Sequence, residues 1–438
     1  MSSDKCANLR IPAACGFAWA SCVQALREAA SSDTVIRHST LCFAALLAIV
    51  WTATPARAVT PAVLVDDELQ AQRVRVTGLN GERISYFDAQ RRLRTESIEQ
   101  VVQLRAIGDE RETVSVAPTA ALPVPEGAAL VLADGQRLAG EWIGASDDGN
   151  ALRWRHPLLG EVSIALDRLR GWRVGDAEAD VEIALDDPPA EDRVVLSNGD
   201  ALSGFVTQVD EAGLSLQQGD DPEPIALPRE RIAGVVLANP ASVEAGTAHR
   251  VVLADGSAMD GHDLTMRSEQ VRFEPVLGDG EPIAAALTQV KRIDFTGTGR
   301  RLVALSACER QVSGGDVFGL AMLPRVAADG ALWLHAPVTV VFTLPSGAER
   351  LAMRAELADE PAAVLEWADL ELVVTMEDQT RRFRLNREQP TASLDMAVAA
   401  RSLRLELLAG VNGPVLDRLW LRDAVVLVVE PRGEAGRQ

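Results

Sequence analysis

Apolar and polar residues alternate with a period of two along much of this chain. Val338 to Leu344 and Leu403 to Leu407 show the alternation clearly, which is typical of strands with one buried face. Almost no segment after Val59 keeps a helical period for more than two turns. The sequence therefore predicts an all-β protein.

A repeat organises the first half of the chain. In three segments an apolar strand leads into Asx-Gly and then into a second Gly: Leu130 to Gly140, Val194 to Gly204 and Val251 to Gly261. Asp-Gly and Asn-Gly supply the positive φ values of a type I′ turn, so each segment predicts a β-hairpin. A degenerate fourth copy precedes them, with Val74 to Val76 entering Asn80-Gly81.

The spacing of the repeats predicts small domains. The Asx residues of the three clear copies lie 64 and 57 positions apart, and about five short strands per copy fit SH3-like barrels, with an opening that resembles Sm-like barrels. A four-bladed propeller is the alternative. Uneven Pro- and acid-rich stretches between copies favour barrels joined by linkers. The expected barrels cover residues 59–116, 125–180, 192–240 and 248–297.

Residues 300–431 carry a different order of strands and motifs. Its parts are Trp333-Leu334-His335-Ala336, Val338 to Phe342, Arg350 to Leu357, Leu370 to Val374, Leu403 to Leu407, Asn412-Gly413 and Asp417 to Ala424. This order resembles the NPCBM family of carbohydrate-binding modules. The resemblance implies a galactose-binding-like jelly-roll β-sandwich that binds a glycan rather than turning it over.

The same resemblance implies a ligand site. The family's Gly-x-x-His-Ser segment is matched by Gly330 to Ala336, which keeps His335 and replaces the Ser. Asp417 and Asp423 are also kept, whereas Trp420 stands one position early and the usual His after the first Asp is missing. The alternatives are that His335 is a core imidazole bonded to a backbone carbonyl, and that the two carboxylates cap turns.

Sugar rings stack on aromatic side chains, and this chain has few of them, at 4% of residues. The predicted sandwich contains Trp333, Trp367 and Trp420. Because they alternate with apolar neighbours, we expect at least two of them to fill the core. Trp367 follows Glu366 in a loop-like stretch, so we expect it to be the most exposed and to bind ligand.

Nothing in the sequence assembles a catalytic centre. The five histidines include no pair at metal-ligand spacing, and His262-Asp263 beside Asp260 is expected to be a solvated turn rather than a metal site. Carboxylate pairs such as Asp186-Asp187 and Asp220-Asp221 lie in turn or linker composition. We therefore expect no catalytic residue and no cofactor, with calcium left open.

The N-terminus carries the features of an export signal. An apolar run from Leu41 to Trp51 follows Arg37-His38 and precedes Ala56-Arg57-Ala58, a cleavage site of the A-x-A kind. The mature chain is then expected to begin at Val59, in the periplasm or outside the cell, with residues 1–33 a spurious extension from a wrongly assigned start. It would keep one cysteine, Cys308, and no intramolecular disulfide.

The net charge of the chain disfavours two classes of binding partner. The chain carries a formal charge of −20, which repels phosphate backbones and anionic lipid, so nucleic acid and membrane surfaces are disfavoured. No span is expected in the mature chain. The sequence predicts an exported, non-catalytic carbohydrate-binding protein of the bacterial envelope, with a glycan or an envelope protein as partner. A protein-interaction scaffold without a small ligand and an accessory module of a glycan-degrading system are the alternatives.

Overall fold

The computed structural model describes residues 60–106, 125, 127–175, 181, 183, 188–219, 223–241, 247–267, 269–277, 281–317, 319–327, 330–358 and 367–430. Within these residues the helices are three-residue 3-10 turns and all other regular structure is strand, which confirms the predicted all-β class. None of these helices is long and apolar enough to cross a membrane. The predicted export signal, Asp186-Asp187, Asp220-Asp221 and Glu366 lie outside the described residues.

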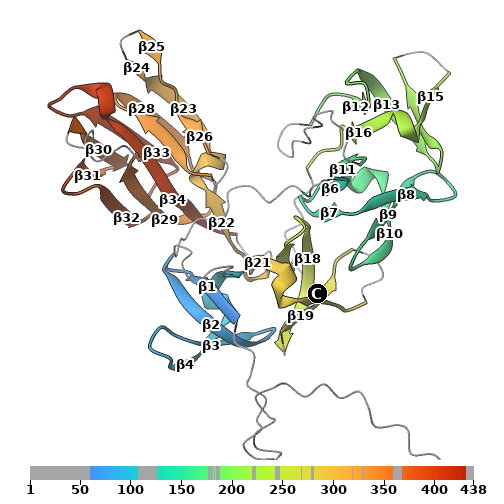
Figure 1. Ribbon diagram of the computed structural model, residues 1–438, viewed down its shortest axis with the longest axis horizontal. Helices are drawn as coiled ribbons and strands as arrows, with labels where there is room; N and C mark the ends of the chain where they lie inside the picture. Colours follow the sequence, from blue (N-terminus) through green and yellow to red (C-terminus); the bar gives the residue numbers. More distant parts are fainter. Residues whose placement is uncertain are drawn as a thin grey trace, which may run out of the picture. The chain divides into compact units, whose positions relative to one another are not determined.

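Four groups of strands, here called modules 1 to 4, occupy residues 60–294 (Figure 1). Module 1 contains β1 (Thr60–Asp66), β2 (Ala71–Asn80), β3 (Arg83–Phe87), β4 (Leu93–Ser97) and β5 (Val101–Ala106). Module 2 contains β6 (Ala129–Leu132), β7 (Arg137–Ala139), β8 (Glu141–Ala145), β9 (Ala151–His156), β10 (Gly160–Ala165) and β11 (Leu169–Arg173). Module 3 contains β12 (Asp192–Leu196), β13 (Ala201–Val209), β14 (Gly213–Gln217), β15 (Ile225–Pro228) and β16 (Ile232–Val236). Module 4 contains β17 (His249–Leu253), β18 (Ala258–Arg267), β19 (Gln270–Pro275), β20 (Ile283–Ala286) and β21 (Val290–Asp294).

Each module reaches its last strand through a 3-10 turn. These turns are η2 (Ile98–Gln100), η3 (Leu166–Arg168), η4 (Arg229–Arg231) and η5 (Leu287–Gln289). The apolar side chains of the four modules form one continuous buried cluster, which includes Trp142, Trp154 and Trp172 of module 2.

The Asx-Gly hairpins form, but their turns are not of type I′. That turn needs positive φ at both central residues, and here only the glycines have it, with φ of 85° at Gly135, 87° at Gly199 and 89° at Gly256. In module 2, Gly135 N donates to Leu132 O at 3.1 Å and Leu132 N donates to Gln136 O at 2.9 Å. The loop therefore has three residues and ends in a left-handed glycine.

The degenerate copy in module 1 was placed on the wrong hairpin. Asn80-Gly81 lies between β2 and β3, whereas the first hairpin turns at Asp66, whose backbone N donates to Gln70 O at 3.2 Å and whose backbone O accepts from Leu69 N at 3.1 Å. Leu69, with φ of 59°, stands where the other modules have glycine. A leucine hides the repeat because left-handed backbone normally selects Gly or Asn.

The modules pair through their last strands. In antiparallel register β5 joins β21 of module 4, and β11 of module 2 joins β16 of module 3. A Cβ added at Gly171 on β11 would stand 2.2 Å from Val235 O on β16, so this pair needs a glycine at the crossing. Strand β18 also pairs β2 and β7. The result is one 18-stranded sheet that runs through all four modules.

Residues 300–429 form a β-sandwich of two sheets (Figure 1). One sheet contains β26 (Arg325–Val326), β27 (Leu332–His335), β34 (Arg418–Val429), β29 (Ala348–Leu357) and β32 (Thr391–Ala397), with β22 (Arg300–Ala304) paired to β34. The facing sheet contains β23 (Glu309–Gly314), β28 (Val338–Thr343), β33 (Ser402–Ala409), β30 (Asp369–Met376) and β31 (Gln379–Asn386). A short hairpin joins β24 (Asp316–Val317) to β25 (Leu320–Ala321). The inner faces of the two sheets share one apolar core, which includes Cys308, the one cysteine among the described residues.

Module 1 packs against this sandwich. Leu69 and Val102 form a small buried cluster with Ala352, Val425 and Leu427, which lie on β29 and β34. Leu69 is 2% exposed. The side chain that occupies the left-handed position of the first hairpin in module 1 is therefore one of those that contact the sandwich.

Candidate functional site

Trp333 and Trp420 lie on the outer face of the sandwich and not in its core. Both are half-buried, and neither belongs to the core cluster, which takes their neighbours Leu332, Leu334 and Leu419. The expectation that at least two tryptophans fill the core was therefore wrong. Each ring stands between two buried leucines of its strand, Leu332 and Leu334 or Leu419 and Leu421, and neighbouring positions of a strand point to opposite faces.

The two indoles form the centre of a strip across four strands. Trp333 is paired with Trp420, Trp420 with Glu356, and Arg325 with Trp333. The guanidinium carbon of Arg325 stands 5.5 Å from the Trp333 ring centre, and that of Arg422 stands 5.4 Å from the Trp420 ring centre. Arg422 also donates to Glu356 Oε2 at 3.0 Å. Cations over indole faces hold the strip in place.

Asp423 lies beside this strip at a β-bulge. Its φ is 54°, and the register between β29 and β34 shifts between Ala352 and Arg354. Arg354 Nε lies 3.6 Å from Asp423 Oδ2. An aspartate tolerates left-handed backbone better than most residues, so the bulge accounts for this residue without a ligand.

His335 is buried, with 2% of its surface exposed. Its Nδ1 lies 2.7 Å from the backbone oxygen of Ala336, and its ring centre lies 5.9 Å from that of Trp333. This is the arrangement expected of a core imidazole bonded to a backbone carbonyl. The buried ring offers little surface to a ligand in solution.

Asp417 is fully buried and fixes a loop. Its carboxylate accepts the backbone N–H of Gly410 at 2.9 Å and that of Asp369 at 3.2 Å. Burial raises the pKa of Asp417, while these two donors act in the opposite direction. Asp369 in turn is held by Arg384 at 2.7 and 2.8 Å, and this guanidinium lowers the pKa of Asp369.

Trp367 is the exposed tryptophan of the sandwich, with 59% of its surface accessible. Its backbone oxygen accepts the side-chain amide of Asn412 at 3.1 Å. It lies two residues before Asp369 and so at the end of the sandwich that Asp417 organises. The described backbone from Trp367 to Asp369 is thus held by hydrogen bonds from Asn412 and Asp417.

The five predicted site residues fall into two groups. Trp367, Asp417 and His335 belong to one end of the sandwich, where Ala336 N donates to Asp417 O at 2.9 Å. Trp420 and Asp423 belong to the strip on the outer sheet face. No group of three or more His, Cys, Asp or Glu suited to a metal ion occurs among the residues that the structure describes.

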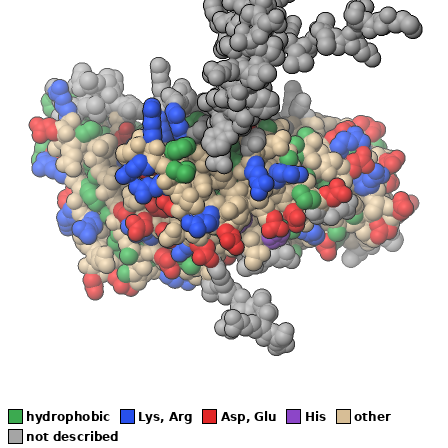
Figure 2. Space-filling view, turned by 90° about the horizontal axis from the view of Figure 1, so that it is seen from below, with side chains coloured by type: hydrophobic (Ala, Val, Ile, Leu, Met, Phe, Trp, Pro, Cys, Tyr) green, Lys and Arg blue, Asp and Glu red, His purple; other side chains and the backbone are tan. Residues whose placement is uncertain are grey.

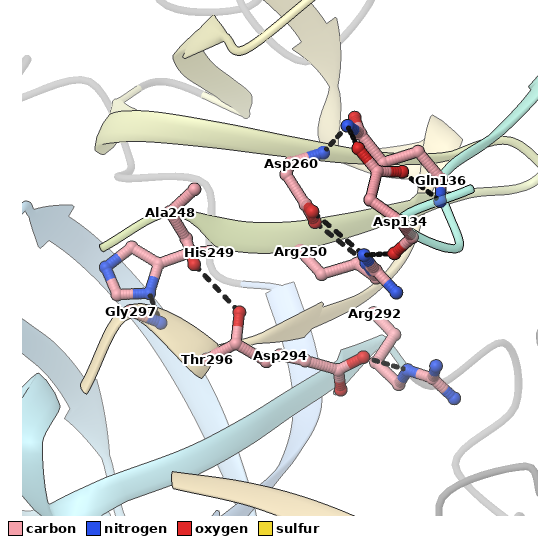
Figure 3. A network of polar contacts seen from close by, with 10 residues as sticks. All are labelled: Asp134, Gln136, Ala248, His249, Arg250, Asp260, Arg292, Asp294, Thr296 and Gly297. Carbon is pink, nitrogen blue, oxygen red and sulfur yellow. Dashed lines mark hydrogen bonds and ion pairs between the residues drawn. The ribbon is translucent and has the colours of Figure 1, made fainter. Parts of the chain in front are cut away.

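A polar network joins modules 2 and 4 at Asp260 (Figure 3). Asp260 is engaged by Arg250 at 2.7 and 2.8 Å, and its backbone N donates to Gln136 Oε1 at 2.8 Å. Arg250 also reaches Asp134 O at 3.2 Å. These groups hold two modules together, which is a structural role.

A cluster of arginines in module 1 was missed in the sequence. Two adjoining hollows of about 610 and 520 Å³ share Arg73, Asp88 and Ala89 in their walls. We call them the arginine groove, after five residues of their walls: Arg73, Arg75, Arg91, Arg92 and Arg94. The sequence does show three arginines, Arg91, Arg92 and Arg94, within four positions of one hairpin. The negative net charge of the whole chain drew attention away from this local basic cluster. Figure 2 shows basic and acidic side chains interspersed over one face of the molecule.

Comparisons with known proteins are sparse. The chain matches no model of a known protein family and no curated protein. Among solved structures, a CBM51 module from Clostridium perfringens in complex with methyl-galactose is 12% identical, with a TM-score of 0.21, over 28% of this chain and 99% of that one. Tandem CBM51 modules of a Streptococcus pneumoniae glycoside hydrolase are 10% identical, with a TM-score of 0.22, over 80% of this chain and 93% of that one.

A third solved structure, CBM51-2 with GlcNAc and INT domains of Clostridium perfringens ZmpB, is 11% identical, with a TM-score of 0.23, over 39% of this chain and 38% of that one. All three are carbohydrate-binding modules. TM-scores of this size establish neither the fold nor the function of this chain.

Proposed function

We propose that this chain is a non-catalytic carbohydrate-binding protein whose sugar platform is Trp367 at the end of the sandwich. One observation carries the proposal: a large indole is left 59% exposed in a sandwich whose other two tryptophans are covered by their own arginines. Exposed aromatic rings of this kind stack on the C–H face of pyranose rings.

The surroundings of Trp367 suit a preformed site. Asn412 and Asp417 hold the backbone from Trp367 to Asp369, so this part of the site needs little ordering when a ligand binds. Arg384 and Asp369 form a charged pair on the adjacent strands β31 and β30, and the Arg384 side chain is 65% exposed. Such pairs can hydrogen-bond vicinal hydroxyls of a sugar. The NPCBM resemblance agrees with this role, and calcium stays an open component.

A scaffold that binds other envelope proteins is the second candidate. The observation that favours it is an exposed apolar surface at the β24–β25 hairpin of the sandwich, where Leu320 in β25 is 67% exposed and Leu323, two residues after β25, is 56% exposed. An apolar surface of this kind is typical of protein contacts. An accessory role beside a glycan-degrading enzyme is compatible with either candidate.

A glycan array probed with the purified chain, with and without calcium, tests the proposal. Trp367→Ala should weaken binding of the best glycan about fivefold to tenfold, the loss of roughly 1 kcal/mol of ring stacking. Phe205→Ala is the matched control, because Phe205 is an exposed ring, 52% accessible, in module 3. Equal binding by the parent and Trp367→Ala, or no glycan bound by the parent, would favour the scaffold.

The proposal includes export to the periplasm or the medium. The apolar run and the Ala56-Arg57-Ala58 site support it. Mass spectrometry of the protein isolated from its host should find Val59 at the N-terminus. Intact protein that begins at Met1 and stays in the cytoplasm contradicts this part.

A further inference from the structure

We propose that Asp417 is the positioning residue of the Trp367 platform, and that glycan binding requires the ionised form of its carboxylate. The inference rests on the proposed glycan-binding function and adds a control of that same site: the platform releases neutral glycans as the pH falls. Asp417 is fully buried, so it acts on the ligand through the platform and not by contact.

The two oxygens of the Asp417 carboxylate hold the two segments that form the platform. Oδ1 accepts the backbone N–H of Asp369, two residues after Trp367, at 3.2 Å. Oδ2 accepts the backbone N–H of Gly410 at 2.9 Å, two residues before Asn412. The side-chain amide of Asn412 then donates to Trp367 O at 3.1 Å. One carboxylate therefore fixes both the segment that carries the indole and the loop beside it.

These two segments lie in direct contact. A Cβ added at Gly410 would stand 1.4 Å from Asp369 O, so the two backbones leave no room between them. Gly413 N donates to Gly410 O at 3.1 Å, which closes the loop into a turn. On the other side, the backbone oxygen of Asp417 accepts Ala336 N at 2.9 Å. The carboxylate is thus held from its own backbone, and a change in its charge acts on the platform.

Protonation removes part of this arrangement. An ionised carboxylate accepts on both oxygens, whereas a carboxylic acid carries a donor on one of them. That donor would face a backbone N–H, at Gly410 or at Asp369, which needs an acceptor. One of the two segments is then released. Because only the ordered platform binds, the apparent Kd rises as the ordered fraction falls.

The surroundings of Asp417 shift its titration towards neutral pH. Burial raises the pKa of Asp417, and the charge of Asp369 acts in the same direction. The two backbone donors and the charge of His335 act in the opposite direction. Arg384 engages Asp369 and lowers the pKa of Asp369, so Asp369 loses its charge at a lower pH than Asp417 does.

A raised pKa separates binding from stability at this residue. The ionised carboxylate lowers the stability of the folded chain at neutral pH, and this effect disappears as the pH falls through the raised pKa towards the ordinary value of 3.8. Proton uptake by Asp417 therefore favours the folded chain while it loosens the platform. Weaker binding in acid is then not a sign of unfolding caused by Asp417.

A printed array of neutral glycans, probed with increasing concentrations of the whole chain, tests the inference. At pH 7, Asp417→Asn should bind about threefold to tenfold more weakly than the parent, because the amide keeps one acceptor and loses the other. Asp192→Asn is the matched control. Asp192 of module 3 is also buried, and its carboxylate accepts the backbone N–H groups of Val206 and Ala238, both at 2.8 Å. This control should bind as the parent does.

The same array should be read from pH 7 down to pH 4, with circular dichroism to follow the folded fraction. The half-saturating concentrations of the parent and of Asp192→Asn should rise about threefold to tenfold, and that of Asp417→Asn should stay nearly constant, because its amide does not titrate. The profile of the parent remains a test if Asp417→Asn does not fold. A flat profile in the folded parent would overturn the inference.

Three further results would overturn the inference while the proposed function stands: equal binding by Asp417→Asn and the parent at pH 7, equal weakening by Asp192→Asn, or the same acid profile in Asp417→Asn as in the parent. Failure of the proposed function looks different. The parent then binds no glycan of the array, or Trp367→Ala leaves the binding of every glycan unchanged, and the inference falls with the function.

Discussion

At the scale of single residues, left-handed positions show where this chain departs from its own repeat. In the first hairpin the left-handed position is glycine in three modules and Leu69 in module 1, and Arg91 takes a left-handed position in the β3–β4 hairpin of module 1. Leu69 is buried against the sandwich and Arg91 is exposed beside the arginine groove. The sequence alone could not reveal either role, because a left-handed residue without glycine looks like any other loop residue.

Leu69→Gly should lower the free energy of unfolding by about 1–4 kcal/mol. Removal of a buried leucine side chain costs about 2–5 kcal/mol, and relief of the left-handed strain returns about 1 kcal/mol. Glu269 has φ of 65° and an exposed side chain, so Glu269→Gly removes strain without burial and should be neutral or stabilising. Urea denaturation of both variants measures the difference. A stabilised Leu69→Gly would show that this contact with the sandwich contributes nothing.

His156 makes the junction of modules 2 and 4 sensitive to pH. Its Nδ1 accepts the N–H groups of Leu158 at 3.1 Å and Leu159 at 3.2 Å, and its Nε2 lies 3.1 Å from the hydroxyl of Ser257 in module 4. The ring is therefore neutral with its proton on Nε2, and burial lowers the pKa of His156, with the Asp255 carboxylate acting in the opposite direction.

Because the unfolded chain takes up this proton near pH 6.5 and the folded chain only at lower pH, the stabilisation is complete above about pH 6.5 and is lost as the pH falls. The free energy of unfolding should fall more between pH 7 and pH 5 in the parent than in His156→Gln. His262 is exposed, and His262→Gln should keep the parent's pH dependence. If His156→Gln keeps it as well, another group governs the junction.

At the scale of elements, periodicity predicted the strands but not their partners. Alternation located β28 and β33, and the Asx-Gly signals located the first hairpins of three modules. The same alternation could have predicted that Trp333 points outward, because Leu332 and Leu334 on either side of it are core residues. Pairing of β5 with β21 and of β11 with β16 is made by backbone groups, which carry no sequence signature.

Gly171→Ala tests the pairing of β11 with β16. The added Cβ would stand 2.2 Å from Val235 O, so the strands must separate, and we expect a loss of about 2 kcal/mol or more in the free energy of unfolding. At Gly78 a Cβ would meet its nearest atom, Met266 O, at 3.9 Å. Gly78→Ala should therefore be neutral or slightly stabilising. Equal stabilities of the two variants, measured by thermal unfolding, would contradict the tight crossing.

At the scale of the whole molecule, the linkers separate the modules along the sequence, whereas strand pairing joins them in space. Polar, Pro-containing segments such as 186–192 separate the modules in the sequence, while modules 2 and 3 share a strand pair and one apolar core. The prediction of barrels joined by linkers included the separating segments, but it did not include the strand pairing and the shared core. A sheet that continues from one module to the next depends on contacts far apart in sequence.

Limited proteolysis should cut the chain near residues 186–192, because a polar linker with Pro is a preferred site of nicking. The two fragments should then elute together in size-exclusion chromatography, since β11 remains paired with β16, and should separate only in denaturant. Fragments that separate in native buffer would show that the modules pair weakly. Cutting first between Leu130 and Trp172 would show that module 2 is the least stable part.

The pairing of last strands also restricts how such a chain can evolve by duplication. Module 1 joins module 4 and module 2 joins module 3, so each module uses up the open edge of another. Gain or loss of a single copy would leave one strand edge without a partner, and such edges promote aggregation. Descendants of this architecture should therefore change their copy number by two, or replace the missing partner with a second chain.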